Sequence, residues 1–209
     1  MAKLIGSAPN QISTNGDLGK MAFEDKVSVA NINATWTKDS TTFLRGDNTF
    51  AEVPAGGITE ADQWRLTVTK TDNTDITANL ERVDDASFGY IGTGMTESSG
   101  IFTFPSTGIY QISTTFKGYS SNTSDTMKIL TYASIDSGST YDQISETSLS
   151  STTSANLGDT ATSHVFVDVT NTSTVKVKFA GSSLSAGSNI EGNTDTNQTH
   201  FTFIRLGDT

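Results

Sequence analysis

The chain has 209 residues, enough for one sizeable domain or one domain with a short appendage, because domains usually run about 100–150 residues. Only 34% of the residues are hydrophobic and about 29% are Ser or Thr, so the core has to be thin, and the excess of β-branched Thr favours an all-β fold over a helical enzyme. The lack of Cys excludes disulfides and cysteine–zinc sites, and the net charge of −10 disfavours nucleic acid and anionic lipid surfaces as partners.

Residues 1–57 are predicted to form an extended arm. Turn and linker residues such as Pro9, Gly19 and Pro54 interrupt this segment, and its large apolar residues are too widely spaced for a core of their own. Such residues can each anchor the arm on a neighbouring protein. The predicted attachment residues are Ile12, Leu18, Met21, Phe23 and Trp36. The first residues contain too short an apolar run for a signal peptide or a membrane span, which predicts assembly in a cytosol without membrane insertion.

Residues 58–209 are predicted to form a separate head domain, because two-residue alternation of apolar and polar side chains begins after the hinge at Gly56-Gly57. The first alternation places Trp64, Leu66 and Val68 on one face of a strand. Further strands place Phe102, Phe104, Tyr110, Ile112 and Phe116 inward, with Pro105 as a strand terminator. Weaker strands are expected over residues 128–135 and 143–149.

The alternation at residues 165–169 and 175–179, with a turn at 170–173, predicts a hairpin. Seven or eight short strands with regular turn signals predict a closed two-sheet sandwich or jelly roll.

The last strand, residues 200–206, has apolar side chains on both faces. Phe201 and Phe203 face one way, and Ile204 and Leu206 face the other. A second apolar face argues for a subunit contact, and the alternative is a strand covered by the N-terminal arm. The residues predicted for the trimer interface or core are Tyr110, Ile112, Phe201, Phe203, Ile204 and Leu206.

Residues 94–112 resemble the signature of complement-type globular heads, which belong to the jelly-roll superfamily that includes tumour necrosis factor. The family pattern is Gly-x-Phe-Thr-x-Pro-x-x-Gly-x-Tyr-x-Phe, and Ile112 replaces its final aromatic residue. The matching positions are Gly100, Phe102, Thr103, Pro105, Gly108 and Tyr110. The resemblance covers about residues 60–209 and implies an all-β jelly-roll head that forms a homotrimer.

Residues 14–25 and 40–50 resemble segments of bacteriophage fibre and appendage proteins, particularly from marine phages. This resemblance implies a virion protein, assembled in the bacterial cytoplasm, whose arm binds tail, baseplate or capsid proteins. The tripeptide Arg45-Gly46-Asp47 is then interpreted as a turn and not as an adhesion motif.

Candidate chemistry in the head is sparse. Glu191, Asn193 and Asp195 alternate in a polar loop, which favours a solvated loop over a calcium site. Asp84-Asp85 are adjacent and expected to point to opposite sides of a strand, which would prevent paired acid and base catalysis. His164 and His200 are expected to make hydrogen bonds at strand edges. No enzyme activity, metal or cofactor is predicted.

The leading hypothesis is a short trimeric tail fibre or appendage whose head contacts a host glycan or protein. Its loops are rich in Ser, Thr, Asn and Tyr, and the predicted contact residues are Tyr119, Tyr141, Asn189 and Asn193. The alternative is a capsid or tail decoration protein that stabilises the virion without binding a receptor. A glycan-degrading fibre is a third, weaker hypothesis.

Overall fold

The computed structural model describes residues 42–45, 49–52, 57–122, 125–151 and 157–209. Contacts divide the chain into two units, Met1–Gly56 and Gly57–Thr209, which are described separately. None of the described residues belongs to a helix long and apolar enough to cross a membrane. The predicted attachment residues of the arm (Ile12, Leu18, Met21, Phe23 and Trp36) lie outside the described residues.

The described part of the first unit is a small antiparallel sheet of β1 (Thr42–Leu44) and β2 (Phe50–Glu52), in which Leu44 lies opposite Phe50. The amide of Arg45 donates a hydrogen bond to the carbonyl of Thr49 at 2.7 Å. The turn predicted at Gly46 falls between these strands, outside the described residues.

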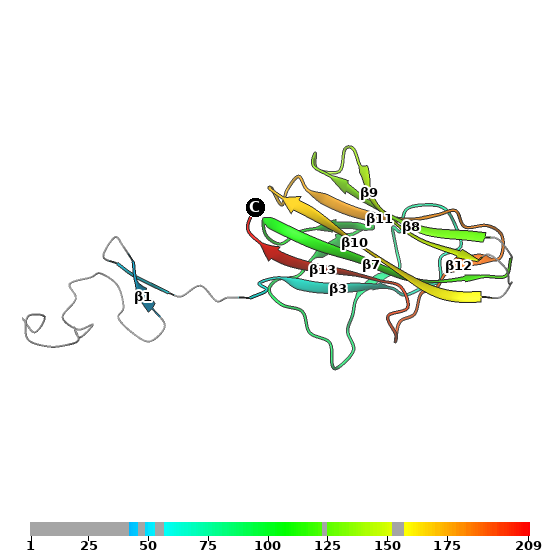
Figure 1. The fold of residues 1–209 in the computed structure, drawn as a ribbon, viewed down its shortest axis with the longest axis horizontal. Coiled ribbons are helices and arrows are strands. Elements are labelled where there is room, and N and C mark those ends of the chain that lie inside the picture. Colours follow the sequence, from blue (N-terminus) through cyan, green and yellow to red (C-terminus); the bar gives the residue numbers. More distant parts are fainter. Residues whose placement is uncertain (1–41, 46–48, 53–56, 123–124, 152–156) are drawn as a thin grey trace, which may run out of the picture. The chain divides into compact units, whose positions relative to one another are not determined.

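The second unit, which we call the head, is a sandwich of two antiparallel sheets (Figure 1). Sheet I has the order β10 (Leu157–Val169), β7 (Gly108–Ser120), β13 (His200–Gly207), β3 (Ala61–Leu66) and β4 (Leu80–Arg82), with β12 (Ser188–Ile190) also paired to β7. Sheet II has the order β5 (Thr96–Ser98), β6 (Ile101–Thr103), β11 (Lys176–Ser182), β8 (Asp125–Ser134) and β9 (Asp142–Ser151). The described residues contain no helix, and the predicted all-β sandwich is confirmed.

The core is a single aromatic-rich layer between the sheets. Phe102, Phe179, Phe201 and Phe203 are each at most 1% exposed, and the rings of Phe179 and Phe201 stack with centroids 3.9 Å apart. Trp64 adds an edge-to-face contact with Phe102 at 5.5 Å. Aromatic side chains bury a large apolar area each, so a chain with few apolar residues still fills one layer. The inward positions predicted for Phe102, Phe104, Tyr110, Ile112 and Phe116 are confirmed.

Pairs of hydroxyl groups occupy the parts of the interior that the apolar side chains do not fill. The hydroxyls of Thr114 and Thr131 lie 3.2 Å apart in the buried space between the sheets. At one side of the sandwich, the Ser163 hydroxyl in β10 lies 3.2 Å from that of Ser145 in β9. A buried hydroxyl costs free energy unless it is hydrogen-bonded, and pairing these groups with each other removes most of that cost.

The hairpin predicted from residues 165–179 is wrong. β10 pairs with β7 along its whole length, from Leu157↔Ser120 to Val169↔Gly108, whereas β11 pairs with β8 and β6 in the other sheet. Residues 170–175 therefore carry the chain from sheet I to sheet II, and the amide of Val175 bonds to the carbonyl of Asn171 at 3.0 Å. Alternation identifies the inward side chains but contains no information on which strand lies alongside.

Two predicted strands are too long. β3 ends at Leu66, and Val68 is 53% exposed, since the chain leaves sheet I there. β8 ends at Ser134, and Ile135 is 79% exposed in the following turn. In both cases the alternation continues by chance past the last paired residue.

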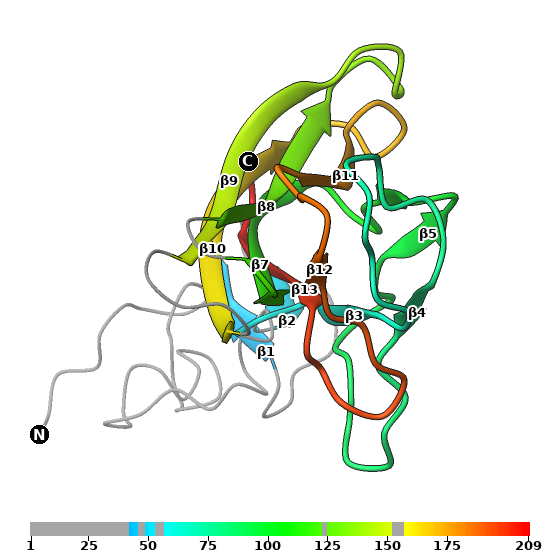
Figure 2. The same ribbon diagram turned by 90° about the vertical axis from the view of Figure 1, so that its right-hand side faces the viewer.

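Residues 67–79, which we call the bridging loop, close one side of the sandwich between the two sheets (Figure 2). Lys70 forms a β-bridge with Ile190 of sheet I, and Asp75 forms one with Ala180 of sheet II. The amide of Ile76 donates to the carbonyl of Phe179 at 2.8 Å. Backbone hydrogen bonds thus attach the first half of the loop to sheet I and its second half to sheet II.

The two ends of the sandwich differ in what they carry. Residues 57–61 and 207–209 lie at one end, here called the terminal end, because Ala61 pairs with Ile204. Residues 120–122, the start of β8 at Asp125 and the turn at 182–188 lie at the other, distal end, about 40 Å away along the thirteen residues of β7. At the distal end the buried Asp125 carboxylate accepts hydrogen bonds from Ser120 at 2.9 Å, from Ser185 at 3.0 Å, and from Ser188. These bonds tie the distal turns together.

Candidate functional site

The outer face of sheet I carries a transverse line of apolar side chains near the terminal end. The strand registers place Phe166 opposite Gln111, Gln111 opposite Ile204, and Ile204 opposite Ala61. Ala61 in turn exchanges two backbone hydrogen bonds with Ile91, at 2.9 and 3.0 Å. We call Phe166, Ile204, Ala61 and Ile91 the apolar row.

Water reaches much of the apolar row in the single chain. Phe166 is 64% exposed and Ile91 is 47% exposed, and the adjacent Leu206 is 53% exposed. The row crosses the full width of the sheet from its β10 edge to the loop beside β3. Gln111 of β7 separates Phe166 from the neighbouring Ile204, Ala61 and Ile91. A group of exposed hydrophobic side chains on one face is typical of a surface that a partner covers.

The residues predicted for the trimer interface or core separate into two groups. Tyr110, Ile112, Phe201 and Phe203 fill the core between the sheets and are at most 1% exposed. Ile204 and Leu206 lie on the outer face of β13. Only these last two are placed where another subunit could reach them.

The sequence pattern pointed to neither Phe166 nor Ile91 as a surface residue of interest. Phe166 occupies an outward position between the inward Val165 and Val167, where a polar residue is expected. This apolar residue at an outward position is the feature of the sequence that could have indicated a surface contact. Ile91 belongs to a loop, and only its pairing with Ala61 brings it to the sheet.

The next line of side chains on the same face, two residues along the strands from the apolar row, is polar. The Ser113 hydroxyl lies 2.7 Å from Nδ1 of His164, and the Gln63 amide donates to the Thr202 hydroxyl at 2.8 Å. His200 lies 3.1 Å from the carbonyl of Asn197, and burial lowers its pKa, with the Asn197 carbonyl raising it by less. Both histidines make the hydrogen bonds expected of them.

Arg65 projects from β3 and is only 2% exposed because residues 81–85 cover it. Its guanidinium donates to Glu81 at 2.6 Å, to Asp84 at 2.6 Å and to Asp85 at 3.0 Å. Burial lowers its pKa, but the hydrogen bond and charge of Glu81 and the charge of Asp85 outweigh this, and the net shift is upward. The expectation that Asp84 and Asp85 point to opposite sides of a strand is wrong, because β4 ends at Arg82 and both carboxylates turn to one guanidinium.

The predicted host-contact residues do not form one site. Tyr119 and Asn189 are cross-strand neighbours at the distal end of sheet I. The amide of Asn193 bonds to the carbonyl of Leu66 nearby, at 2.9 Å. Tyr141 follows β8 at the terminal end, where its ring lies 4.4 Å from the Lys178 ammonium. The length of β8 separates Tyr141 from the other three by about 30 Å.

The alternating oxygens at residues 191–195 do not converge on a shared point. Glu191 pairs with Lys117 at 2.7 Å, and the side-chain oxygen of Asn193 accepts the amides of Asp195 and Thr196 at 2.7 and 2.8 Å. Within the described ranges, no three acidic or histidine side chains gather as a metal site would require. The loop is thus folded on its own polar groups.

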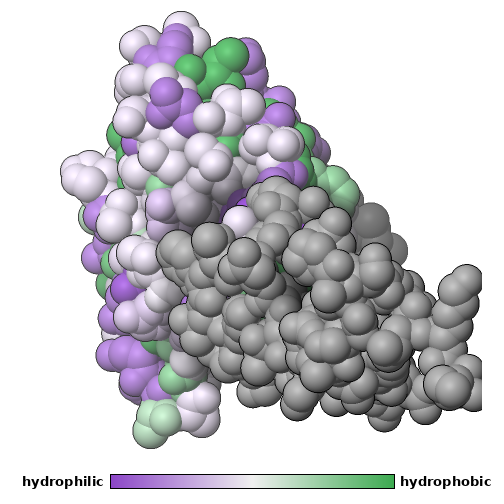
Figure 3. All heavy atoms as spheres, turned by 90° about the vertical axis from the view of Figure 1, so that its left-hand side faces the viewer, coloured by the Kyte–Doolittle hydropathy of each residue, from purple (hydrophilic) through white to green (hydrophobic). Residues whose placement is uncertain are grey.

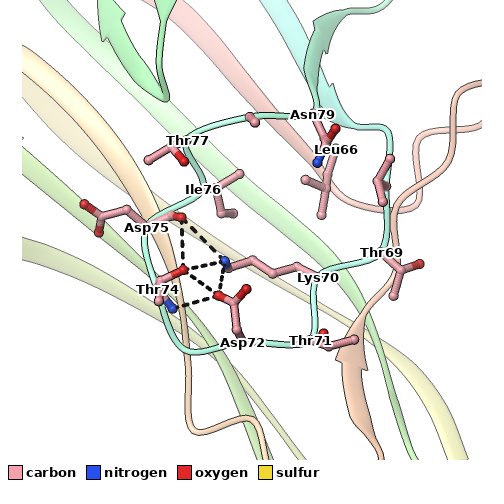
Figure 4. A pocket seen from close by; sticks show the side chains of 12 residues that line it. Leu66, Thr69, Lys70, Thr71, Asp72, Thr74, Asp75, Ile76, Thr77 and Asn79 are labelled. Atoms are coloured by element: carbon pink, nitrogen blue, oxygen red, sulfur yellow. Dashed lines mark hydrogen bonds and ion pairs between the residues drawn. The ribbon is translucent and has the colours of Figure 1, made fainter.

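At the terminal end, the visible surface of the head is mostly hydrophilic or neutral, with separate hydrophobic spots (Figure 3). The bridging loop encloses a hollow of about 220 Å³ (Figure 4). The apolar row and this hollow are two features of the described surface that could receive a partner or a ligand.

The chain matches no protein-family model and no curated protein. Among solved structures, it superposes on Eiger TNF from S. frugiperda with a TM-score of 0.55 at 12% identity, over 73% of this chain and 96% of that chain. Murine APRIL at pH 5.0 gives a TM-score of 0.52 at 13% identity, over 70% and 98% of the two chains. The globular domain of zebrafish complement 1qA protein gives 0.46 at 8% identity, over 72% and 99%. At these identities the likeness concerns the fold alone, and the head is therefore a jelly roll similar to that of TNF proteins.

Proposed function

We propose that the head assembles as a homotrimer through the outer face of sheet I, and that the chain is a short appendage of a bacteriophage particle. The observation that carries the self-association is the apolar row. Phe166, Ile204 and Ile91 lie in one line across the sheet, and each fully buried side chain of this kind is worth about 1.5–3 kcal/mol.

The geometry of the row supports a closed ring of copies. The row runs from one edge of sheet I, at Phe166, to the loop beyond the opposite side, at Ile91. Different ends of the row can therefore meet in neighbouring copies, which is a heterologous contact, and such contacts form rings when the rotation closes. The resemblance of residues 94–112 to complement-type heads implies three copies.

The virion role is supported by the resemblance of residues 14–25 and 40–50 to phage fibre segments. Because the chain enters the head at residue 57, at the terminal end, a head held on a particle by its arm has its distal end free. Tyr119, Asn189 and Asn193 lie in the distal half and are the proposed contacts with a host glycan or protein.

Self-association is tested by light scattering on the full chain. Phe166→Glu and Ile204→Glu are each expected to convert a trimer into monomers, because they bury a charge in the contact. Ile101→Glu is the matched control, since Ile101 is 36% exposed on sheet II and should leave the trimer intact. A monomeric wild-type chain, or a trimer that only Ile101→Glu disrupts, would refute the assignment of this face.

The host-contact role is tested by competition. Purified trimer is expected to inhibit adsorption of the phage that carries it. Particles on which the protein is found by labelled electron microscopy, but whose adsorption excess trimer does not reduce, would indicate a capsid or tail decoration protein instead.

A further inference from the structure

The hollow in the bridging loop has both apolar and polar walls. Leu66 and Ile76, which are 2% and 3% exposed, direct their side chains toward its interior (Figure 4). The methylene stem of Lys70 crosses its lower part, and the side-chain amide of Asn79 lies beside Leu66. Leu66 and Ile76 belong to the core and close the bottom of the hollow with little exposed surface, so the accessible lining is mainly polar. Polar groups at the rim match the hydroxyl edges that a sugar ring presents.

The walls are held in place before any ligand arrives. The Lys70 ammonium donates to Asp72 at 2.5 Å and to Thr74 at 3.0 Å, and the Thr74 amide donates to the same Asp72 oxygen at 3.1 Å. The Thr67 amide bonds to the Asn79 carbonyl at 2.8 Å. Pre-organised walls reduce the entropy lost on binding.

Two polar groups of the hollow remain available. Among the described residues, neither the side-chain amide of Asn79 nor the second carboxylate oxygen of Asp72 has a hydrogen-bond partner, and the Asp72 side chain is 62% exposed. Asn79 also adopts a left-handed φ of 60°. An amide and a carboxylate together can donate to and accept from vicinal hydroxyls.

Charge and size narrow the class of ligand. The one cation of the hollow, Lys70, is paired with Asp72, and Asp75 is paired with Lys178 at 2.7 Å, so no positive charge remains for an anion. The hollow of about 220 Å³ is smaller than the about 300–1,000 Å³ typical of drug-sized ligands, which favours a group the size of one sugar ring over a nucleotide. Its mainly polar lining disfavours an acyl chain.

We propose that this hollow binds one neutral sugar ring of a host-surface glycan. The choice of a host glycan as the source rests on the proposed function, whereas binding of the ring itself does not. Each site is weak, at about millimolar affinity, and three copies on one appendage raise the avidity by about 10²–10⁴.

The first test is saturation-transfer NMR on the full chain with methyl glycosides of glucose, galactose and mannose at up to about 100 mM, a concentration chosen for millimolar binding. Transfer to the ring C–H protons of the neutral glycosides is expected, because the ring lies inside the hollow. Glucuronic acid is the charged comparison and is expected to bind more weakly. No transfer to any neutral glycoside, or equal binding of glucuronic acid, would overturn the proposal.

Variants locate the site. Asn79→Gly removes the amide while suiting the left-handed φ, so the fold should be retained, and it is expected to weaken binding about threefold to tenfold. Asn79→Asp, which removes the donor at constant size, should do the same. Thr196→Ala changes an exposed residue outside the hollow and should bind as the wild type does. Wild-type affinity in both Asn79 variants would place the sugar elsewhere and reject the hollow.

A second arm separates this proposal from the proposed function. If Asn79→Gly loses the free sugar yet still inhibits phage adsorption fully, the hollow is a sugar site but not the one that recognises the host. If the wild type inhibits adsorption but binds none of the glycosides, the appendage function holds and the sugar site is rejected.

Discussion

Arg65 shows how one residue organises a whole segment. Its fork of donors holds three carboxylates from residues 81–85 against the outer face of sheet I. The partners are unequally hydrated, because the side chains of Glu81, Asp85 and Asp84 are 35%, 46% and 75% exposed. Each ion pair therefore adds little Coulomb energy, and the main effect of Arg65 is to fix the position of residues 81–85.

Replacing Arg65 with Met should lower the free energy of unfolding by about 1–3 kcal/mol, less than for a fully buried pair because water can solvate the released carboxylates. Urea denaturation at fixed protein concentration measures the effect. Lys128→Met is the control, since Lys128 forms a more exposed pair with Glu146 at 2.9 Å and should change stability by at most about 0.5 kcal/mol. Equal losses in the two variants would contradict the role given to Arg65.

His200 should make stability depend on pH. Burial lowers the pKa of His200 in the folded head below the ordinary 6.5. Just below pH 6.5, His200 is therefore protonated more in the unfolded chain than in the folded head. The free energy of unfolding is therefore at its full value above pH 6.5, and it decreases as the pH falls from 6.5 toward the pKa of His200 in the folded head. His200→Gln should lose less stability than the wild type between about pH 7.5 and about pH 5.5 in urea denaturation. Thr202→Ser, which alters the same face without a titrating group, should retain the wild-type slope.

At the scale of elements, the connection from β6 to β7 needs a backbone conformation with positive φ, which residues other than glycine rarely adopt. Gly108 has a φ of +139°, and a Cβ there would lie 2.4 Å from the carbonyl oxygen of Gly207. Tyr110 then packs inward with its hydroxyl 2.8 Å from that of Ser106. The predicted end of a strand at Pro105 is confirmed, since β6 ends at Thr103 and β7 begins at Gly108.

Gly100 provides the test at this scale. It has a φ of +82°, and an added Cβ would lie 2.1 Å from the carbonyl oxygen of Ile76, so Gly100→Ala should destabilise the head by about 2 kcal/mol or more. Gly89→Ala is the matched control, because a Cβ there meets nothing within 4 Å, and its melting temperature should stay within a few degrees of the wild type. A stable Gly100→Ala variant would mean that the β5–β6 turn can relax away from Ile76.

At the scale of the whole molecule, the charge opposes assembly while the apolar row favours it. Each chain has a formal net charge of −10, and the proposed trimer would bring three such chains together. Exposed like charges repel over a screening length of about 30 Å at 10 mM salt and about 3 Å at 1 M salt.

The proposed trimer should therefore become more stable as salt is added. Sedimentation velocity at low protein concentration should show more monomer at about 10 mM NaCl than at about 500 mM NaCl. A trimer that dissociates as salt rises would instead indicate an interface held by ion pairs and would argue against the apolar row as its centre.

The amino-acid sequence alone determined the all-β class and the inward side chains of several strands. Burial alternates with a period of two along a single strand, so residues such as Phe102, Tyr110 and Ile112 could be assigned from local pattern. The two-sided apolar pattern of residues 200–206 also placed Ile204 on a face opposite Phe203 before any neighbour was known.

Only the tertiary structure decided which strands pair. It put β10 and β11 in opposite sheets, brought Asp84 and Asp85 to Arg65, and aligned Phe166, Ile204 and Ile91 in one row. It likewise separated Tyr141 from the other predicted contact residues. The reason is physical: strand register joins residues that are distant in the chain, and a local pattern specifies which face a side chain takes but not which strand lies beside it.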